Sequence, residues 1–377
     1  MRDEDSDDDW AADDAAETAD RERKKEPPPA ISGEEFLAWR SPRLVANGPT
    51  RLDNPLWHWL VRTRHSGYSA NAAMGGPSSS TAGPTWCFDR FGKSETALPD
   101  GRIVHIAGEH EDYYDPDFYI YNDVVVIGPD GSIEINGYSR DAFPPTDFHS
   151  ATLVADAIFI IGSLGYPYQR VVGSTPVLRL QVSSMKIEPV ATTGNAPGWI
   201  HRHSAKLAED GETILVRGGE LWLGSERTMQ ENIDAWSLHT ATGVWTRLSA
   251  LDWQRWTMLR KDRKRNRLWD TRQERWRRDH ASLGLDSYWN YAEAPDFDAL
   301  DALYRPHPAS PAPTEGREHN VFLTTIDGVT VRFKEDAWSV QATVEGRLSN
   351  GRLEELQRAT ISTLEKLDAS EWEIESG

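Results

Sequence analysis

The chain has 377 residues, a formal net charge of −19, 38% hydrophobic residues and sixteen tryptophans. This length allows two or three domains with a sizeable core, and the acidic balance disfavours general affinity for nucleic acids. Cys87 is the only cysteine, so no intramolecular disulfide can form, and no apolar stretch is as long as a membrane span or a signal-peptide core. We therefore expect a cytoplasmic protein with no membrane partner.

Residues 1–30 predict a disordered acidic tail. They hold twelve Asp/Glu against five Lys/Arg and end in three consecutive prolines. Because this segment has few large apolar side chains, burial cannot offset the entropy of ordering it. Such a tail either keeps the chain soluble or docks a basic partner.

Two short helices and a flexible connection are predicted over residues 31–83. Ser32 begins a capping-box pattern before an apolar run. Asn54, followed by proline, is typical of an N-cap and a first helical residue. The Gly/Ser/Ala-rich stretch 66–83 then predicts a mobile linker.

A pattern with a period of about 55 residues runs through the middle of the chain, which is typical of stacked structural units. The copies that begin at Ser94 and Ser204 each continue with an Asp-Gly pair and a strand, and they end at Gly108 and Gly218 after the same interval. The copy at Ser150 is shorter and lacks the Asp-Gly pair. Each copy predicts four short antiparallel strands with hairpin turns, and such units must stack as blades to bury their faces.

Two histidines hold equivalent places in this repeat. His149 and His203 each immediately precede the serine that begins their own copy. This equivalence favours a structural role where the chain enters a blade over a role as metal ligands.

Residues 84–249 resemble the kelch-repeat family of β-propellers. The resemblance rests on the double glycine Gly218-Gly219, on the strand from Asn232 to Leu238, and on Gly243 with Trp245. It implies a mainly β fold: a kelch-like β-propeller, or an open arc of blades. The N-terminal helices and a C-terminal α/β unit, which are predicted separately, flank it. Kelch motifs specify a fold much more than a function.

Residues 250–305 predict a helical segment rich in basic and aromatic residues. From Trp253 to His280 there is no glycine or proline, and eleven Lys/Arg face four Asp/Glu. Asp252 is a possible N-cap. One interpretation is a helix that contacts nucleic acid through arginines and stacking aromatics. We favour the other, an amphipathic helix whose arginines contact acidic side chains, because no nucleic-acid motif accompanies the run.

A linker and a small α/β unit are predicted to complete the chain. Residues 306–316 are rich in proline and form the linker, and residues 317–377 form the unit. Within it, Asp327-Gly328 predicts a hairpin turn, and residues 338–345 continue the sheet. Residues 352–367 have the apolar spacing of a helix that covers one face of that sheet.

The long loops of the repeats predict a binding face. In a kelch-like blade the loops between the second and third strands gather on one side, where recognition tends to reside. Here they carry the aromatic and arginine side chains that dominate binding hot spots: Tyr113, Tyr114, Tyr119, Tyr166, Tyr168, Arg170, Trp222 and Arg227. We therefore predict a protein-binding or adaptor protein with another protein as its partner. The alternative that these side chains only pack the loops together stays open.

The loop after Gly108 suggests a second function. Its carboxylates and imidazole are ligands suited to a divalent cation: Glu109, His110, Glu111 and Asp112. They lack a recognised ligand spacing, so no cofactor is assigned beyond this possible cation. The alternative function is a metal-dependent enzyme on a kelch propeller, either oxidase-like or epimerase-like. No catalytic residue is assigned, because the sequence has no nucleophile elbow, Walker loop or dinucleotide fingerprint.

Overall fold

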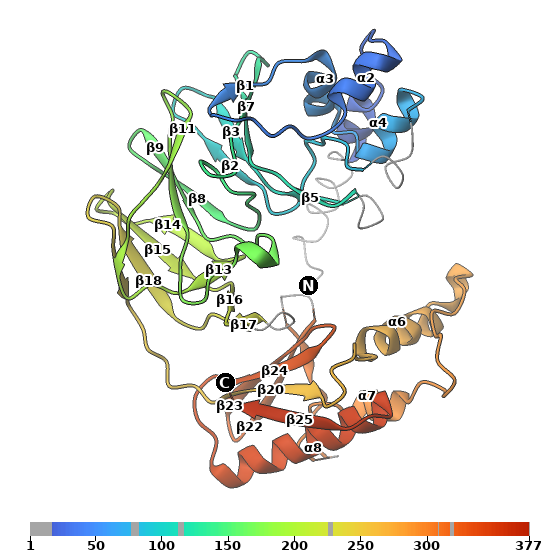
Figure 1. Cartoon of the computed structure of the whole chain (residues 1–377). Helices are drawn as coiled ribbons and strands as arrows, with labels where there is room; N and C mark the ends of the chain where they lie inside the picture. The colour runs from blue at the N-terminus through green and yellow to red at the C-terminus, as the bar shows by residue number, and fades with distance from the viewer. Residues whose placement is uncertain are drawn as a thin grey trace, which may run out of the picture. The chain divides into compact units, whose positions relative to one another are not determined.

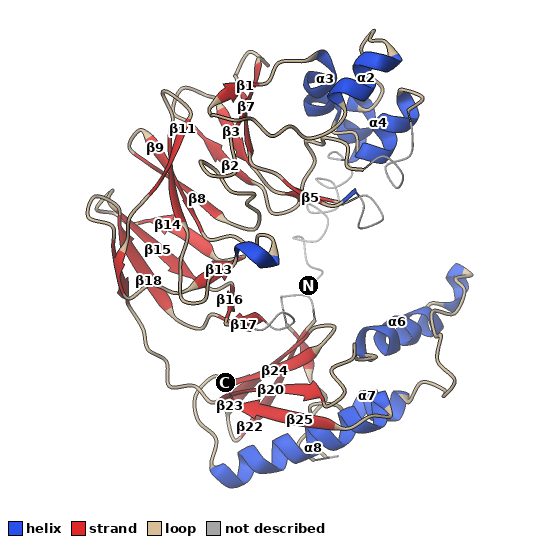
Figure 2. Cartoon of the chain, in the orientation of Figure 1, coloured by secondary structure: helices blue, strands red, loops and turns tan. Residues whose placement is uncertain are grey.

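The computed structural model describes residues 17–76, 83–111, 117–224, 229–307, 309–316 and 320–376 (Figure 1). The chain divides into two compact units, residues 1–249 (unit 1) and residues 250–377 (unit 2). The fold is mainly β, with several antiparallel sheets and a few helices (Figure 2). Across the part of the chain that the structure describes, no helix is long and apolar enough to cross a membrane.

The described residues of unit 1 contain three sheets that correspond to the three sequence repeats. Sheet A has the order β1-β7-β6-β3-β2, sheet B the order β11-β10-β9-β8, and sheet C the order β12-β19-β18-β15-β14. The strands of sheet A are β1 (Thr50–Arg51), β2 (Ser94–Ala97), β3 (Ile103–Ile106), β6 (Asp123–Ile127) and β7 (Ile133–Gly137). Those of sheet B are β8 (Ser150–Val154), β9 (Ala157–Ile161), β10 (Val177–Gln181) and β11 (Lys186–Pro189). Those of sheet C are β12 (Thr193–Gly194), β14 (Ser204–Leu207), β15 (Thr213–Arg217), β18 (Ala235–His239) and β19 (Val244–Arg247).

Two small sheets and a helical turn lie where the long loops leave these sheets. One sheet pairs β4 (Glu109–His110) with β5 (Tyr119–Ile120). The other has the order β13-β16-β17, formed by β13 (Trp199–His201), β16 (Glu220–Trp222) and β17 (Met229–Glu231). The loop between β9 and β10 contains the turn η2 (Pro167–Gln169). These elements give the predicted loop face much of its regular structure.

The three sheets pack on one another in chain order. Strand β8 lies beside both β2 and β14, so the first strands of the three repeats are neighbours. Because successive side chains of a strand alternate, Ile158 and Ile160 of β9 pack toward sheet A, whereas Phe159 and Ile161 pack toward sheet C. Sheet B is therefore buried on both of its faces.

Helices cover the other face of sheet A. These are α2 (Gly33–Trp39), α3 (Pro55–Thr63) and α4 (Gly67–Ala73). Trp57 of α3 stacks on Trp86 with ring centroids 4.6 Å apart, within a core that includes Val125 and Ile135 of sheet A. The predicted caps of α2 and α3 are confirmed, because the side chains of Ser32 and Asn54 accept backbone hydrogen bonds there.

The predicted linker 66–83 is corrected in part. Its first residues form α4, since the Ser66 side chain caps that helix by accepting from the backbone N–H of Ser69. Residues 77–82 lie outside the described residues. In the predicted acidic tail, residues 17–23 are helical, and the carboxylate of Glu26 pairs with Arg62 of α3 at 2.8 Å. Residues 1–16 also lie outside the described residues.

The two repeat histidines link neighbouring sheets. His149 Nε2 lies 2.8 Å from the hydroxyl of Ser94, and His203 Nε2 lies 2.8 Å from that of Ser150. The hydroxyl of Ser204 instead donates to a carbonyl within its own sheet. Burial lowers the pKa of His149 to about 3 and that of His203 to about 4, so both rings are neutral at physiological pH. The structural role predicted for these histidines is confirmed.

The described residues of unit 2 form a six-stranded sheet with three α-helices. Its order is β21-β22-β23-β24-β20-β25. The strands are β20 (Arg255–Arg260), β21 (Thr314–Glu315), β22 (Val321–Ile326), β23 (Val329–Glu335), β24 (Ser339–Val344) and β25 (Trp372–Ser376). The helices are α6 (Leu268–Asp279), α7 (Phe297–Ala302) and α8 (Asn350–Asp368). The predicted hairpin, third strand and covering helix are confirmed as β22, β23, β24 and α8.

The helix expected from Trp253 onward is wrong for its first part. Residues 255–260 form β20, which lies between β24 and β25. Trp256 and Met258 alternate with more exposed residues and are buried in the core of unit 2, and this period of two is that of a strand. Only α6 is helical in this basic region.

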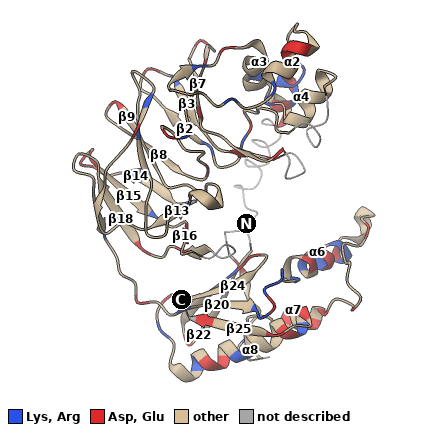
Figure 3. Ribbon diagram, viewed as in Figure 1, with Lys and Arg blue, Asp and Glu red and all other residues tan. Residues whose placement is uncertain are grey.

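The basic side chains of α6 are paired within unit 2. Arg272 pairs with Glu335 at 2.7 Å, and Arg278 pairs with Glu274 at 2.8 Å. The Arg267 guanidinium lies 3.2 Å from a carboxylate of the following loop. Figure 3 shows Asp and Glu interleaved with Lys and Arg along this part of the chain. These pairs agree with the interpretation that the arginines of this segment contact acidic side chains.

Candidate binding face on the repeat loops

Two predicted site residues hold the β9–β10 loop in place. The hydroxyl of Tyr166 accepts a hydrogen bond of 3.0 Å from the backbone N–H of Ile120 on β5. The guanidinium of Arg170 donates to the carbonyls of Leu164 at 2.9 Å and Gly165 at 3.1 Å. Tyr166 and Arg170 therefore hold the β9–β10 loop in position. For these two residues the alternative interpretation applies, in which the side chains pack the loops together.

A third predicted residue, Tyr168, points outward from the same loop. Its ring stacks on Tyr166 with centroids 5.5 Å apart and planes inclined by 8°. The residue is nevertheless 72% exposed. Stacking on a hydrogen-bonded neighbour restricts the rotation of this ring and presents it to solvent at low entropic cost.

Exposed aliphatic residues follow Tyr168 on its own loop, and another lies on the loop after β16. Val171 and Val172 follow it on the β9–β10 loop and are 58% and 57% exposed, and Leu223 after β16 is 56% exposed. The two loops are in contact, because a Cβ placed on Gly224 would lie 3.3 Å from Val172 Cγ2. We call Tyr168, Val171, Val172 and Leu223 the apolar cluster. Exposed apolar side chains gathered in this way mark interaction sites more often than single ones do.

Trp222 lies at the base of the second loop. It pairs in register with Trp199 across β16 and β13, and it is half-buried. The indole N–H of Trp199 on β13 donates to the carbonyl of Leu164 at 3.3 Å, which ties the β9–β10 loop to this small sheet. The predicted residue Trp222 thus connects the apolar cluster to the sheet beneath it.

A small pocket lies beside the anchored loop. Its volume is about 250 Å³, and its lining is mostly apolar. Trp199 lines it together with Pro145, Ile160 and Leu178, and Gln169 of η2 contributes a polar side chain. The pocket is a suitable receptor for one apolar side chain of a partner, as in the centres of protein interfaces.

Tyr119 lies on the same face but serves packing. Its ring meets Tyr121 edge-on with centroids 5.0 Å apart, and burial raises the pKa of its hydroxyl. Tyr119, Tyr166, Tyr168, Arg170 and Trp222 are therefore all placed on the loop side of unit 1. The other three predicted residues, Tyr113, Tyr114 and Arg227, lie outside the described residues.

The proposed metal ligands are directed to other partners. Glu109 faces the carboxyl of Asp147, and Nδ1 of His110 lies 2.8 Å from the carbonyl of Asp89. Within the ranges that the structure describes, no group of three or more His, Cys, Asp or Glu could hold a metal ion. Asp112 lies outside those ranges, and Glu111 is exposed. The cation site therefore stays a prediction.

Glu109 and Asp147 form a pair of carboxyl groups that no pattern in the sequence connects. Asp147 is fully buried, and its Oδ1 accepts from the backbone N–H of Gly165 at 2.6 Å and from the hydroxyl of Ser163 at 3.2 Å. Burial and the nearby Asp147 raise the pKa of Glu109 to about 7, and burial also raises that of Asp147. Burial and the neighbouring carboxyl group therefore favour the protonated form of Glu109 up to about neutral pH.

Sequence reasoning missed the aliphatic part of the face. Val171 and Val172 are adjacent apolar residues within a long loop, and that is the one local signal that could have indicated them. Leu223 gives no such signal. Asp147 lies two residues before His149, just as His201 lies two residues before His203 in the next copy. An alignment of the repeats could therefore have indicated Asp147.

Comparisons with known proteins leave the family open. No family description matches the sequence, and no curated protein matches it. Among solved structures, the structure of YjhT aligns with 69% of this chain and 82% of its own, at 11% sequence identity and a TM-score of 0.32. A TM-score this low does not establish a shared fold.

Proposed function

We propose that this chain is a cytoplasmic protein-binding or adaptor protein. Sheets A, B and C are the blades of an open kelch-like arc, and the loops on one side of it hold the partner. The observation that carries the proposal is the apolar cluster, whose four side chains are each more than half exposed on two loops in contact. Exposed apolar groups of this kind gain free energy when a partner covers them.

The support beneath the cluster strengthens the proposal. Tyr166, Arg170 and Trp199 hold the β9–β10 loop through four hydrogen bonds to backbone groups. A loop fixed before binding loses less conformational entropy when the partner arrives. The partner we expect is a protein segment with one aliphatic or aromatic side chain for the pocket beside Trp199.

Quantitative affinity capture from cells that express the chain tests this proposal. Val172→Asp places a charge within the cluster and is expected to remove the captured partner. Val244→Asp makes the same change at another exposed valine, on β19 of unit 1, and is the matched control. Proteins captured equally by the wild type and by both variants would contradict the proposal, provided that circular dichroism shows both variants folded.

A metal-dependent enzyme remains the second candidate because of the carboxyl pair. A carboxyl group whose pKa lies near 7 is suited to proton transfer, and Glu109 is such a group. Elemental analysis of the purified chain separates the two functions. A stoichiometric metal that is lost in His110→Ala would favour the enzyme.

A further inference from the structure

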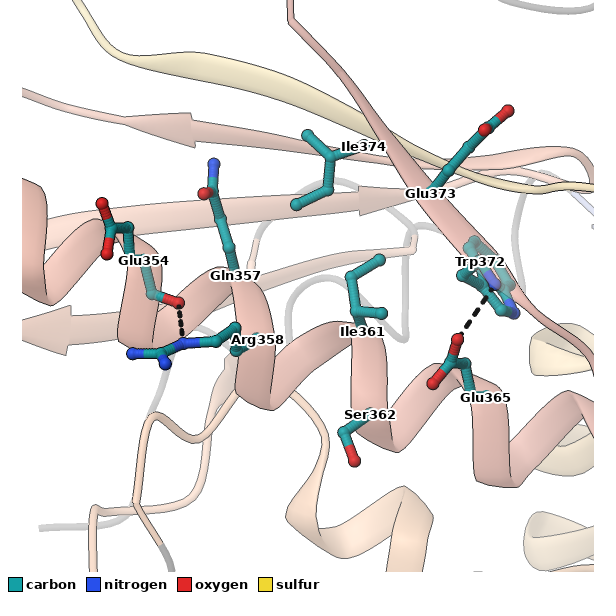
Figure 4. A pocket seen from close by; sticks show the side chains of 9 residues that line it. All are labelled: Glu354, Gln357, Arg358, Ile361, Ser362, Glu365, Trp372, Glu373 and Ile374. Atoms are coloured by element: carbon teal, nitrogen blue, oxygen red, sulfur yellow. Dashed lines mark hydrogen bonds between the residues drawn. The ribbon is translucent and has the colours of Figure 1, made fainter.

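Unit 2 has a groove between helix α8 and strand β25. Its volume is about 550 Å³. Glu354, Arg358, Ile361 and Glu365 line it from α8, and their spacing of three or four residues places them on one stripe of the helix. Figure 4 shows the side chains of Ile361 and Ile374 pointing toward each other across the groove. The floor is therefore apolar, while its rim is charged.

The backbone of β25 has an open side along this groove. In the described part of unit 2, β25 pairs with β20 and with no other strand. The backbone N–H of Lys261 donates to the carbonyl of Glu371 at 3.0 Å, so Glu373 directs its backbone groups to β20 as well. Trp372 and Ile374 alternate with Glu371 and Glu373, so their backbone N–H and C=O groups point to the open side of β25.

The carboxylate of Glu365 shows that this open side can bind a hydrogen-bonding group. It accepts a hydrogen bond of 3.3 Å from the backbone N–H of Trp372, as Figure 4 shows. Helix α8 thus already binds one of the outward-pointing N–H groups of β25, that of Trp372, at the end of the groove. The N–H and C=O of Ile374 lie further along the same edge, where a sheet edge normally serves as a template for another strand.

We propose that an extended peptide of a partner protein adds to β25 as a further strand of the unit 2 sheet. Its backbone pairs with the outward N–H and C=O of Ile374. One of its aliphatic side chains enters the groove between Ile361 and Ile374. Strand addition at an edge that lies beside a groove is an established mode of peptide recognition. This surface belongs to unit 2, so it is independent of the apolar cluster of unit 1.

The charge of the rim selects a basic peptide. Three carboxylates, those of Glu354, Glu365 and Glu373, line the groove. Glu373 is paired with Arg263 at 2.7 Å, which leaves the carboxylates of Glu354 and Glu365 against the guanidinium of Arg358. A second copy of this chain is a poorer occupant. Antiparallel pairing of two β25 strands about Ile374 would place Glu373 opposite Glu375 of the other copy, and like charges directly opposite destabilise a sheet.

Fluorescence anisotropy with the full chain tests the proposal. The probe is a labelled peptide, Lys-Val-Lys-Ile-Lys-Val, with capped ends. We expect saturable binding that weakens with added salt. Methylation of the peptide's backbone nitrogens on one edge should weaken binding by about tenfold or more, because it removes strand hydrogen bonds without altering the protein.

Variants of the chain provide the second half of the test. Ile374→Pro removes an outward N–H and leaves the bonds to β20 in place, so it should abolish binding. Ile374→Val keeps that N–H and should bind within about threefold of the wild type. The proposal is overturned if the basic peptide does not bind, if Glu-Val-Glu-Ile-Glu-Val binds equally well, or if backbone methylation has no effect. A dimer in sedimentation that Ile374→Pro disrupts would also overturn it, in favour of a second copy.

Discussion

At the scale of single residues, the face combines fixed polar anchors with exposed apolar tips. The polar groups of Tyr166 and Arg170 form hydrogen bonds with backbone atoms, while the side chains of Tyr168 and Val172 are exposed to solvent. The aromatic and arginine residues selected from the sequence therefore divide between support and contact. Local composition could indicate the face, but it could not assign these two roles, because they depend on which partner atoms the fold brings near.

Glu109→Gln tests the carboxyl pair. A carboxyl group whose folded pKa is raised contributes stability that is complete below its unfolded pKa, and this stability is lost as the pH rises through the folded pKa. For Glu109 the folded value is about 7. A glutamine stays neutral and can still donate to Asp147. Thermal unfolding should therefore show the variant more stable than the wild type by roughly 1 kcal/mol at about pH 8, and nearly equal to it at about pH 5.

Glu209→Gln is the control for this pH series. Its side chain is exposed and lies in another repeat, so we expect no pH-dependent difference in melting temperature between this variant and the wild type. If Glu109→Gln changed stability by the same amount at both pH values, the raised pKa of Glu109 would be contradicted.

At the scale of elements, the repeat is maintained by contacts between equivalent positions. His149 and His203 each bind the serine of the preceding sheet, and glycines allow the chain to pass close to itself. The starts of β2, β8 and β14 follow from the sequence because serine spacing and the turns after them are local signals. Strand β20 does not, because its alternating stretch is short and its partners β24 and β25 follow it by about 80 residues or more, so no adjacent turn or partner strand marks it.

Ser150→Ala tests the link between sheets B and C. Removal of the hydroxyl leaves the buried Nε2 of His203 without its partner, which should destabilise unit 1 by about 1 to 2 kcal/mol in urea unfolding. Ser204→Ala is the matched control at the same repeat position. Its hydroxyl is exposed and has no histidine partner, so we expect a loss below about 0.5 kcal/mol. Equal losses for the two variants would show that the histidine contact does not stabilise the array.

Gly219→Ala tests the second residue of the double glycine. Gly219 has a φ of +80°, and a Cβ placed there would lie 2.4 Å from the carbonyl oxygen of His201. We expect this variant to lose about 3 kcal/mol or more, since backbone strain and a clash with main-chain atoms add.

Gly211→Ala isolates the strain component of that loss. Gly211 has a φ of +72° but open space around its Cβ position, so we expect a loss of about 1 kcal/mol. Chemical unfolding of the full chain would measure the loss of stability of each variant. A loss for Gly219→Ala no larger than that for Gly211→Ala would mean that the close approach to His201 is not required.

At the scale of the whole molecule, the described residues of unit 1 cover each end of the three-sheet array without a fourth sheet. Helices α2, α3 and α4 cover the outer face of sheet A with an apolar core. The outer face of sheet C carries exposed polar side chains such as Lys206, Arg217 and Thr246. A polar face on the terminal unit is how repeat arrays end in solvent. These two caps support the proposed open arc over a closed propeller.

The division into two units predicts that residues 250–377 fold alone. They have a core of their own that includes Trp256, Phe333 and Leu364. We expect a fragment of these residues to unfold cooperatively in thermal circular dichroism. A fragment of residues 306–377 begins at the linker predicted from the sequence and lacks β20, so it should stay unfolded. Cooperative unfolding of the shorter fragment would show that β20 is dispensable.

Site-specific photo-crosslinking tests the central claim most directly. A photoreactive amino acid replaces Tyr168 in the apolar cluster or, in a second protein, Val244 on sheet C, and both chains are irradiated in cells. The proposed function predicts a discrete crosslinked partner protein from position 168 and none from position 244. No discrete product from position 168, or the same products from both positions, would contradict a partner-binding role for the loop face.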